Sequence, residues 1–323
     1  MGLSVKKIAL CAAFYASVFI PAANIWAAQL GGAAHLSARQ TKTTTLVQSV
    51  LPRPVRFREE DGRGLLARAW VNGQGPYTFA IDTGAGGSLL SRRVAAEAGV
   101  RETGGRPVWI GGLSGAGSVA GRNAVVRSLA LGDEQNVIQS DGRFVVTERL
   151  APGVDGVVDP AEAYGSLGFE IDLARGQMTA FDPRQTPLRR NENLPPDGTV
   201  VQWLTDGQSR RPFVMLEGGR RALLDTGSGF GLAVTADAAR ALGIMPGRGR
   251  QHGDVRDLGG GSITAHRIPP ATVRVGSLVL RGIPTDLLTT ARAGSPVLLG
   301  RDALRPFRLT FDPVNRLIRI VPG

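Results

Sequence analysis

The sequence predicts an all-β protein made of two similar lobes, and three observations support this. The chain of 323 residues has 44 glycines and 20 prolines and is 42% apolar, a composition typical of a turn-rich β protein. Its length suits two domains of about 100 to 150 residues each. An apolar run that ends in Asp-Thr-Gly, residues 79–84, recurs 143 positions later at residues 222–227. Two copies of one strand-and-turn pattern indicate a duplicated domain.

The first 28 residues have the features of an export signal. Lys6 and Lys7 precede an apolar run over residues 8–20, and Ala27-Ala28 offers a small-residue cleavage site. We therefore expect a periplasmic or secreted protein without a stable membrane span after cleavage, and an uncleaved membrane anchor is the alternative. The single cysteine, Cys11, lies inside this signal, so the mature chain is predicted to fold without a disulfide.

Two stretches without a regular hydrophobic pattern mark the boundaries of the lobes. Residues 29–58 are rich in Ala, Thr, Gln and Arg and are predicted to form an extended arm or a pro-segment. Residues 184–197 have the proline-rich and polar composition of a linker. The two lobes are therefore predicted at residues 59–183 and 198–323.

The first lobe begins with a predicted β-hairpin. Strands are expected over residues 65–71 and 77–81, and Asn72-Gly73-Gln74-Gly75-Pro76 between them has strong turn chemistry. The second strand ends at Asp82. A short helix is predicted over residues 92–98, where Gly99 stops it.

The second lobe repeats this order. Residues 213–216 and 222–224 are predicted strands around a Gly218-Gly219 turn, and a helix is predicted over residues 236–242. Both lobes close with two more strands, predicted at 169–173 and 178–181 in the first and at 307–311 and 317–320 in the second. A repeat of about 140 residues is too long for a solenoid unit, so these are duplicated domains.

The two aspartates of the triplets, Asp82 and Asp225, suggest acid–base chemistry. If the lobes bring them together, one carboxylate can activate a water while the neighbouring carboxylic acid protonates a carbonyl oxygen. Two carboxyl groups this close share one proton and titrate as a pair. Gly84 and Gly227 would let the backbone approach where a Cβ would intrude.

The paired triplets resemble those of the aspartic proteases. Asp82-Thr83-Gly84-Ala85 is similar to the retropepsin form of the motif, and Asp225-Thr226-Gly227-Ser228 to the pepsin form. The resemblance implies two retropepsin-like β-barrel lobes, an inter-lobe cleft, catalytic Asp82 and Asp225, and supporting roles for Thr83, Gly84, Thr226, Gly227 and Ser228. The threonines are expected to lock the lobes together. A peptide or protein substrate is implied, with no metal or other cofactor, and a chain that carries both half-sites is expected to be a monomer.

Two glycine-rich segments are candidate flaps. Gly111 and Gly112 begin the first, over residues 111–117, and Gly259 and Gly260 begin the second, over residues 259–262. The resemblance implies that such segments close over substrate, and mobile surface loops are the alternative.

The resemblance also implies an apolar pair followed by glycine late in each lobe. Leu298-Leu299-Gly300 fits this pattern. The first lobe departs from it, because Val157-Val158-Asp159 places an acid where glycine is expected, although Val154-Asp155-Gly156 resembles the pepsin version.

The triplets also differ at the third residue after the aspartate, which is Ala85 in the first and Ser228 in the second. A hydroxyl that donates to Asp225 would favour its charged form, so the shared proton is expected mainly on Asp82. The alternative is a Ser228 hydroxyl that bonds to the backbone.

Other functions have less support. The net charge of +11 comes from scattered arginines rather than a basic stripe, so nucleic-acid binding is not expected. Gly84-Ala85-Gly86 lacks the third glycine of a dinucleotide-binding loop. His35, His252 and His266 lack metal-ligand spacing, and no Gly-x-Ser-x-Gly occurs. The alternative left open is a catalytically inactive two-lobed module that binds peptides without cutting them.

Overall fold

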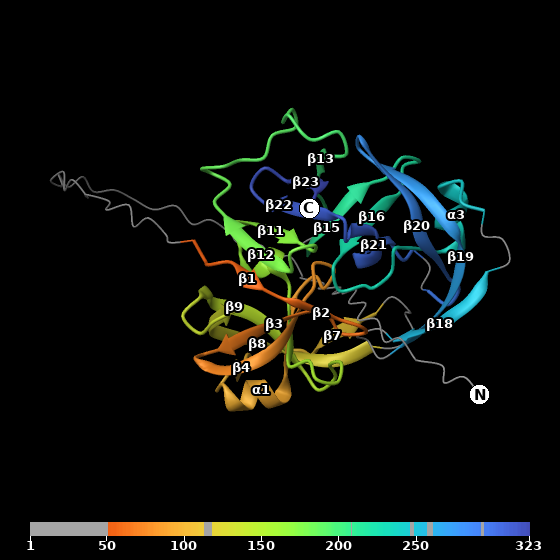
Figure 1. The fold of residues 1–323 in the computed structure, drawn as a ribbon. Helices are drawn as coiled ribbons and strands as arrows, with labels where there is room; N and C mark the ends of the chain where they lie inside the picture. Colours follow the sequence, from red (N-terminus) through yellow and green to blue (C-terminus); the bar gives the residue numbers. More distant parts are fainter. Residues whose placement is uncertain (1–50, 113–117, 208, 246–248, 257–260, 292–293) are drawn as a thin grey trace, which may run out of the picture.

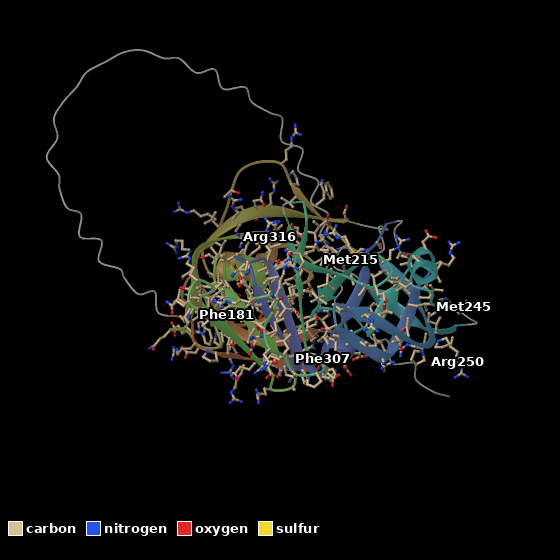
Figure 2. The ribbon with its side chains drawn as sticks, turned by 90° about the horizontal axis from the view of Figure 1, so that it is seen from above. Phe181, Met215, Met245, Arg250, Phe307 and Arg316 are labelled. Atoms are coloured by element: carbon tan, nitrogen blue, oxygen red, sulfur yellow. The ribbon has the colours of Figure 1, made fainter. Side chains whose placement is uncertain are left out.

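The computed structural model describes residues 51–112, 118–207, 209–245, 249–256, 261–291 and 294–323. These residues form three β-sheets with four short helices, in two lobes bridged by the smallest sheet (Figure 1). Seen from above, Met245 and Arg250 lie at the outer end of the second lobe, and Phe181 lies on the side of the first (Figure 2). The predicted all-β class is confirmed.

A six-stranded sheet takes three strands from each half of the chain. In spatial order these are β1 (Val55–Arg56), β12 (Gln177–Phe181), β11 (Gly168–Asp172), β22 (Phe307–Asp312), β23 (Leu317–Pro322) and β13 (Thr199–Gln202). The two halves meet where β11 pairs antiparallel with β22, with Phe169 opposite Phe311. Their rings stack with centroids 4.6 Å apart, and both are fully buried. The lobes are therefore joined by both backbone pairing and an aromatic core.

The sheet of the first lobe has nine strands. In spatial order they are β2 (Arg58–Glu60), β3 (Gly64–Val71), β4 (Gln74–Ile81), β10 (Gly156–Val158), β5 (Ser88–Ser91), β9 (Val137–Thr147), β8 (Ser118–Leu131) and β6 (Arg101–Glu102), with β7 (Val108–Gly111) also paired to β8. Helices α1 (Arg92–Glu97) and α2 (Pro160–Ala163) complete this lobe.

The sheet of the second lobe has eight strands in an equivalent arrangement. They are β14 (Leu204–Asp206), β15 (Ser209–Met215), β16 (Arg221–Asp225), β21 (Val297–Gly300), β17 (Leu232–Val234), β20 (Leu278–Leu288), β19 (Ser262–Val275) and β18 (Arg250–Arg256). Helices α3 (Ala236–Ala241) and α4 (Arg301–Leu304) belong to it. In each lobe the strand that leads to the aspartate lies between its hairpin partner and a parallel strand.

The predicted hairpins and helices are confirmed. Strands β3 and β4 form the first hairpin, and β15 and β16 form the second. Helix α1 begins after Ser91, whose hydroxyl accepts a hydrogen bond from the Val94 amide, and Thr235 caps α3 in the same way. Gly99 and Gly243 follow these helices with positive φ, as glycine at the end of a helix commonly does.

The end of the predicted arm is part of the fold. Strand β1 lies within residues 29–58, pairs with β12, and buries Val55 completely. Its counterpart in the second half is β13, which occupies the other edge of the six-stranded sheet. The structural repeat thus begins at β1, before residue 59. The predicted signal lies outside the described residues. In the parts of the chain that the structure describes, no helix is long and apolar enough to cross a membrane.

Candidate active site

The two Asp-Thr-Gly loops face each other between the lobes. Asp82 follows β4 and Asp225 ends β16, and their exposed fractions are 0% and 1%. A Cβ added at Gly84 would lie 2.6 Å from Asp225 Cγ, and one added at Gly227 would overlap the carboxyl group of Asp82. Each glycine therefore lies directly against the carboxyl group of the opposite loop, where no larger residue fits.

The threonines of the triplets connect the two loops reciprocally. The Thr83 amide donates to the Thr226 hydroxyl and the Thr226 amide donates to the Thr83 hydroxyl, both at 3.1 Å. The Thr83 hydroxyl donates to the Leu224 carbonyl at 2.7 Å, and the Thr226 hydroxyl donates to the Ile81 carbonyl at 3.3 Å. All four bonds are buried, so they cross between the lobes where water does not compete.

The two carboxyl groups have different hydrogen-bond partners. Oδ1 of Asp82 accepts from the Gly84 amide at 2.8 Å, and its Oδ2 is buried with no partner among the described atoms. Oδ1 of Asp225 accepts from two amides, those of Gly227 at 2.9 Å and Ser228 at 3.0 Å. Amide donors stabilise a carboxylate, so the surroundings favour the charged form at Asp225.

The pKa values of the pair follow this asymmetry. Burial raises the pKa of Asp82 well above its usual range, and the neighbouring charge of Asp225 raises it further. Burial also raises the pKa of Asp225, but the interaction with the Asp82 carboxyl group, the Ser228 amide and the charge of Arg301 lower it, so that it is about 6. These shifts favour the shared proton on Asp82. The sequence predicts the same direction, but from a Ser228 hydroxyl that donates to Asp225.

Part of this asymmetry comes from atoms that the sequence does not single out. The Ser228 hydroxyl accepts a hydrogen bond from the Phe230 amide at 3.3 Å, while the Ser228 backbone amide donates to Asp225. Any residue except proline carries that amide. The contribution of the second loop thus depends on its backbone conformation as well as on the serine.

Arg301 is a buried cation beneath the Asp225 loop. Its side chain is 4% exposed, and it donates to the Thr226 carbonyl at 2.7 Å and to the Glu59 carboxylate at 3.0 Å. Arg305 pairs with the same carboxylate at 2.7 Å. Arg301 follows Gly300 in the predicted Leu-Leu-Gly motif, and this position was the only sequence signal for it. Its partner Glu59 lies 242 residues away.

Gly300 allows the second lobe to hold its Asp-Thr-Gly loop by backbone hydrogen bonds. The amides of Gly300, Arg301 and Asp302 donate to the carbonyls of Gly231, Ser228 and Phe230 at 3.0, 2.9 and 3.2 Å. A Cβ at Gly300 would lie 2.8 Å from the Ser228 carbonyl oxygen. This contact explains why the position is glycine.

Asp159 takes the equivalent position in the first lobe. Gly300 lies opposite Asp225 in the β16–β21 register, and Val158 lies opposite Ile81 in the β4–β10 register, so Asp159 follows beside Asp82. Gly156 is not the counterpart of Gly300, because it lies opposite Phe79. The Asp159 amide donates to the Ser88 hydroxyl at 3.1 Å. Pro160, at the position of Arg301, has no amide hydrogen to donate.

Both candidate flaps belong to β-hairpins. Strands β7 and β8 pair from Val108–Gly121 to Gly111–Ser118, so Gly111 ends β7 and Gly112 follows it. In the second lobe, β18 and β19 pair from Arg250–Arg267 to Arg256–Ser262. Gly259 and Gly260 lie between these strands and outside the described residues.

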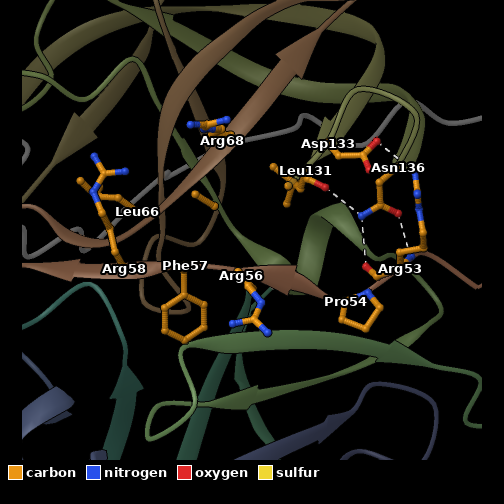
Figure 3. A pocket seen from close by; sticks show the side chains of 12 residues that line it. Arg53, Pro54, Arg56, Phe57, Arg58, Leu66, Arg68, Leu131, Asp133 and Asn136 are labelled. Atoms are coloured by element: carbon orange, nitrogen blue, oxygen red, sulfur yellow. Dashed lines mark hydrogen bonds and ion pairs between the residues drawn. The ribbon is translucent and has the colours of Figure 1, made fainter.

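Folding also gathers arginines that are spaced along the sequence. Arg53, Arg56, Arg58 and Arg68 line a pocket between the β1–β2 segment and β3, and Arg53 pairs there with Asp133 (Figure 3). Neither Asp82 nor Asp225 lines this pocket. Among the described residues, no cluster of three or more His, Cys, Asp or Glu side chains is placed to hold a metal ion.

Two β lobes that each deliver an Asp-Thr-Gly loop to one buried carboxyl pair define the fold of a two-lobed aspartic protease. A family model described as aspartyl protease matches residues 67–171 and, a second time, residues 217–303. The two matches cover more than half of the chain, one in each lobe, and the chain belongs to this family. No curated protein matches the chain.

Proposed function

We propose that the protein is an aspartic endopeptidase that hydrolyses peptide bonds with a water activated by Asp82 and Asp225. The observation that carries this proposal is the packing of Gly84 against the Asp225 carboxyl group and of Gly227 against that of Asp82. A structural turn does not require two carboxyl groups at the contact of two loops. A shared-proton dyad does.

In this mechanism the asymmetry of the pair assigns the two roles. Asp225, the member whose surroundings favour the charged form, removes a proton from the water as the water attacks the peptide carbonyl carbon. Asp82, which carries the shared proton, donates it to the carbonyl oxygen. The resulting gem-diol intermediate collapses when Asp225 gives the water's proton to the leaving nitrogen, a gem-diol hydroxyl returns a proton to Asp82, and the C–N bond breaks. The threonine bonds hold both carboxyl groups in place.

The hairpins β7–β8 and β18–β19 are proposed to hold the substrate in an extended form. Hairpin backbones can bind a peptide by β-pairing, and both predicted flap segments belong to such hairpins. One chain supplies both aspartates, so the active enzyme is proposed to be a monomer. The signal-like N-terminus supports export to the periplasm or the exterior, and N-terminal sequencing of the exported protein tests this.

One observation favours the alternative of an inactive peptide-binding module. Asp159 stands where the second lobe has glycine, so the backbone support of the Asp82 loop differs from that of the Asp225 loop. Hydrolysis remains the better supported function, because both aspartates, both threonines and both glycines of the triplets retain their reciprocal contacts.

The mature protein should be incubated with a peptide library across pH, with and without a pepstatin-type inhibitor. We expect cleavage that the inhibitor suppresses. Peptide binding without cleavage at any pH would favour the binding module instead. Cleavage that the inhibitor does not affect would contradict the dyad mechanism.

A further inference from the structure

Asp159 is a third buried carboxyl group behind the dyad. It is 0% exposed, and its Oδ1 accepts a hydrogen bond from the Ala161 amide at 2.9 Å, which caps α2. Its Oδ2 is buried and has no hydrogen-bond partner among the described atoms. A buried carboxylate oxygen without a donor is costly, so this environment suits a protonated acid.

The charged groups around Asp159 do not neutralise it directly. Glu162 on α2 brings a second carboxyl group close to it, the charge of Arg210 acts on both carboxyl groups, and that of Arg143 acts on Glu162. The Arg210 guanidinium donates to the carbonyls of Ala161 and Gly165 at 3.1 and 2.7 Å. Within the described residues, no ion pair joins Asp159 to a cation.

These surroundings determine the direction in which the pKa of Asp159 is shifted. Burial, followed by the charge of Glu162, raises the pKa of Asp159 well above its usual range, against the opposing effects of the Ala161 and Glu162 amides and of the charge of Arg210. Once Asp159 is ionised, its charge raises the pKa of Asp82. Asp159 is therefore linked to the dyad by charge as well as by the register of β10 beside β4.

We propose that Asp159 is a positioning residue whose protonated form stabilises the fold at acidic pH and whose ionised form keeps Asp82 protonated to higher pH. Its carboxyl group caps α2 and its backbone amide donates to the Ser88 hydroxyl, in the place that Gly300 takes in the second lobe. When it ionises, it adds a negative charge beside Asp82. The effect on activity rests on the proposed proteolysis, whereas the effect on stability does not.

Proton binding by Asp159 links the stability of the fold to pH. The unfolded chain loses the Asp159 proton near pH 4, whereas the folded protein retains it to higher pH. Between these two values the folded state binds one more proton than the unfolded state, so the stabilising contribution is complete below about pH 4 and is lost as pH rises. An asparagine at position 159 does not titrate, so the variant does not lose stability in this way as pH rises.

The test compares the melting temperature of the full mature chain with that of Asp159→Asn from pH 4 to pH 8. The amide should mimic the protonated acid, because its oxygen can accept from the Ala161 amide and its nitrogen, like the hydroxyl of the acid, has no hydrogen-bond partner among the described atoms. We expect similar values near pH 4 and a variant that is more stable by about 2 to 4 °C near pH 7. Asp237→Asn, at a carboxyl group whose side chain is 79% exposed, serves as the control without this trend.

A difference that is constant across pH, or a variant that is less stable at pH 7, would overturn the proposal. If Asp159→Asn does not fold, Asp159→Gly, which installs the residue found in the second lobe, replaces it. This variant loses the cap on α2 at every pH, so the expected result is a melting temperature that rises relative to the wild type from pH 4 to pH 8, and a constant difference overturns the proposal. In the active enzyme, Asp159→Asn should also move the alkaline limb of kcat/KM to lower pH by roughly half a unit, since the charge that raises the pKa of Asp82 is gone. An unmoved limb would refute the link to Asp82. A wild-type chain that shows the stability trend but cleaves nothing would refute only the proposed proteolysis.

Discussion

Thr83 and Thr226 hold the two Asp-Thr-Gly loops together through hydrogen bonds that each threonine makes to the opposite loop. Each amide donates to the opposite hydroxyl at 3.1 Å, and each hydroxyl donates to the carbonyl that precedes the opposite aspartate. The loops are thus fixed to each other rather than only to their own lobes. This makes the geometry of the dyad dependent on the docking of the lobes.

Replacing Thr83 by valine should weaken this docking. The change keeps the shape but leaves the Thr226 amide and the Leu224 carbonyl buried without their partner, which costs about 1 to 3 kcal/mol. Chemical denaturation measures the loss. Thr103→Val, where the hydroxyl makes an exposed bond to the Asn123 carbonyl, should cost less than about 0.5 kcal/mol. Equal losses at the two sites would show that the buried contact has no special role.

Gly84→Ala should remove activity and reduce stability. The new methyl group would lie 2.6 Å from Asp225 Cγ, so one of the two loops must move. We expect kcat to fall by at least about 100-fold. Gly104→Ala is a matched control, because nothing lies within 4 Å of the added methyl group. Near-normal turnover by Gly84→Ala would mean that the carboxyl groups are not in contact with the opposite loops during catalysis.

Arg301→Gln should move the acidic limb of the pH profile. The positive charge of Arg301 lowers the pKa of Asp225, and its loss raises that pKa. Because Asp225 must be ionised to act as base, the acidic limb of kcat/KM should shift to higher pH. Arg305→Gln removes a cation that shares Glu59 but does not contact the Asp225 loop, and it should leave the limb in place. An acidic limb at the same pH in both variants would show that the charge of Arg301 does not lower the pKa of Asp225.

The local features of the fold were predictable from the sequence because they have local causes. The two hairpins, the helix caps and the glycines after the helices depend on residues within a few positions of one another. Strand β1 was not predicted because it has only two residues and lies just after Pro54. Its stability comes from pairing with β12, more than 100 residues away.

Only the duplicated part of the candidate site, the two Asp-Thr-Gly triplets, was predictable from the sequence. Asp82 and Asp225 stand out because their triplets occur twice, and the deviation at Asp159 stands out against Gly300. The Arg301–Glu59 pair depends on a contact between helix α4 and strand β2, which are far apart in the sequence, and the two amides on Asp225 depend on the loop conformation. No residue pattern in the sequence specifies either one.

The most direct test of the central claim is the rate of peptide cleavage by Asp82→Asn and Asp225→Asn, each measured beside the wild-type protein and Asp237→Asn. Each dyad variant lacks the shared proton arrangement, so we expect both to lose cleavage while they keep the melting behaviour of a folded protein and the ability to bind peptide. Asp237→Asn should cleave at the wild-type rate. Near-normal turnover by either Asp82→Asn or Asp225→Asn would contradict the assignment of these two residues as the catalytic dyad.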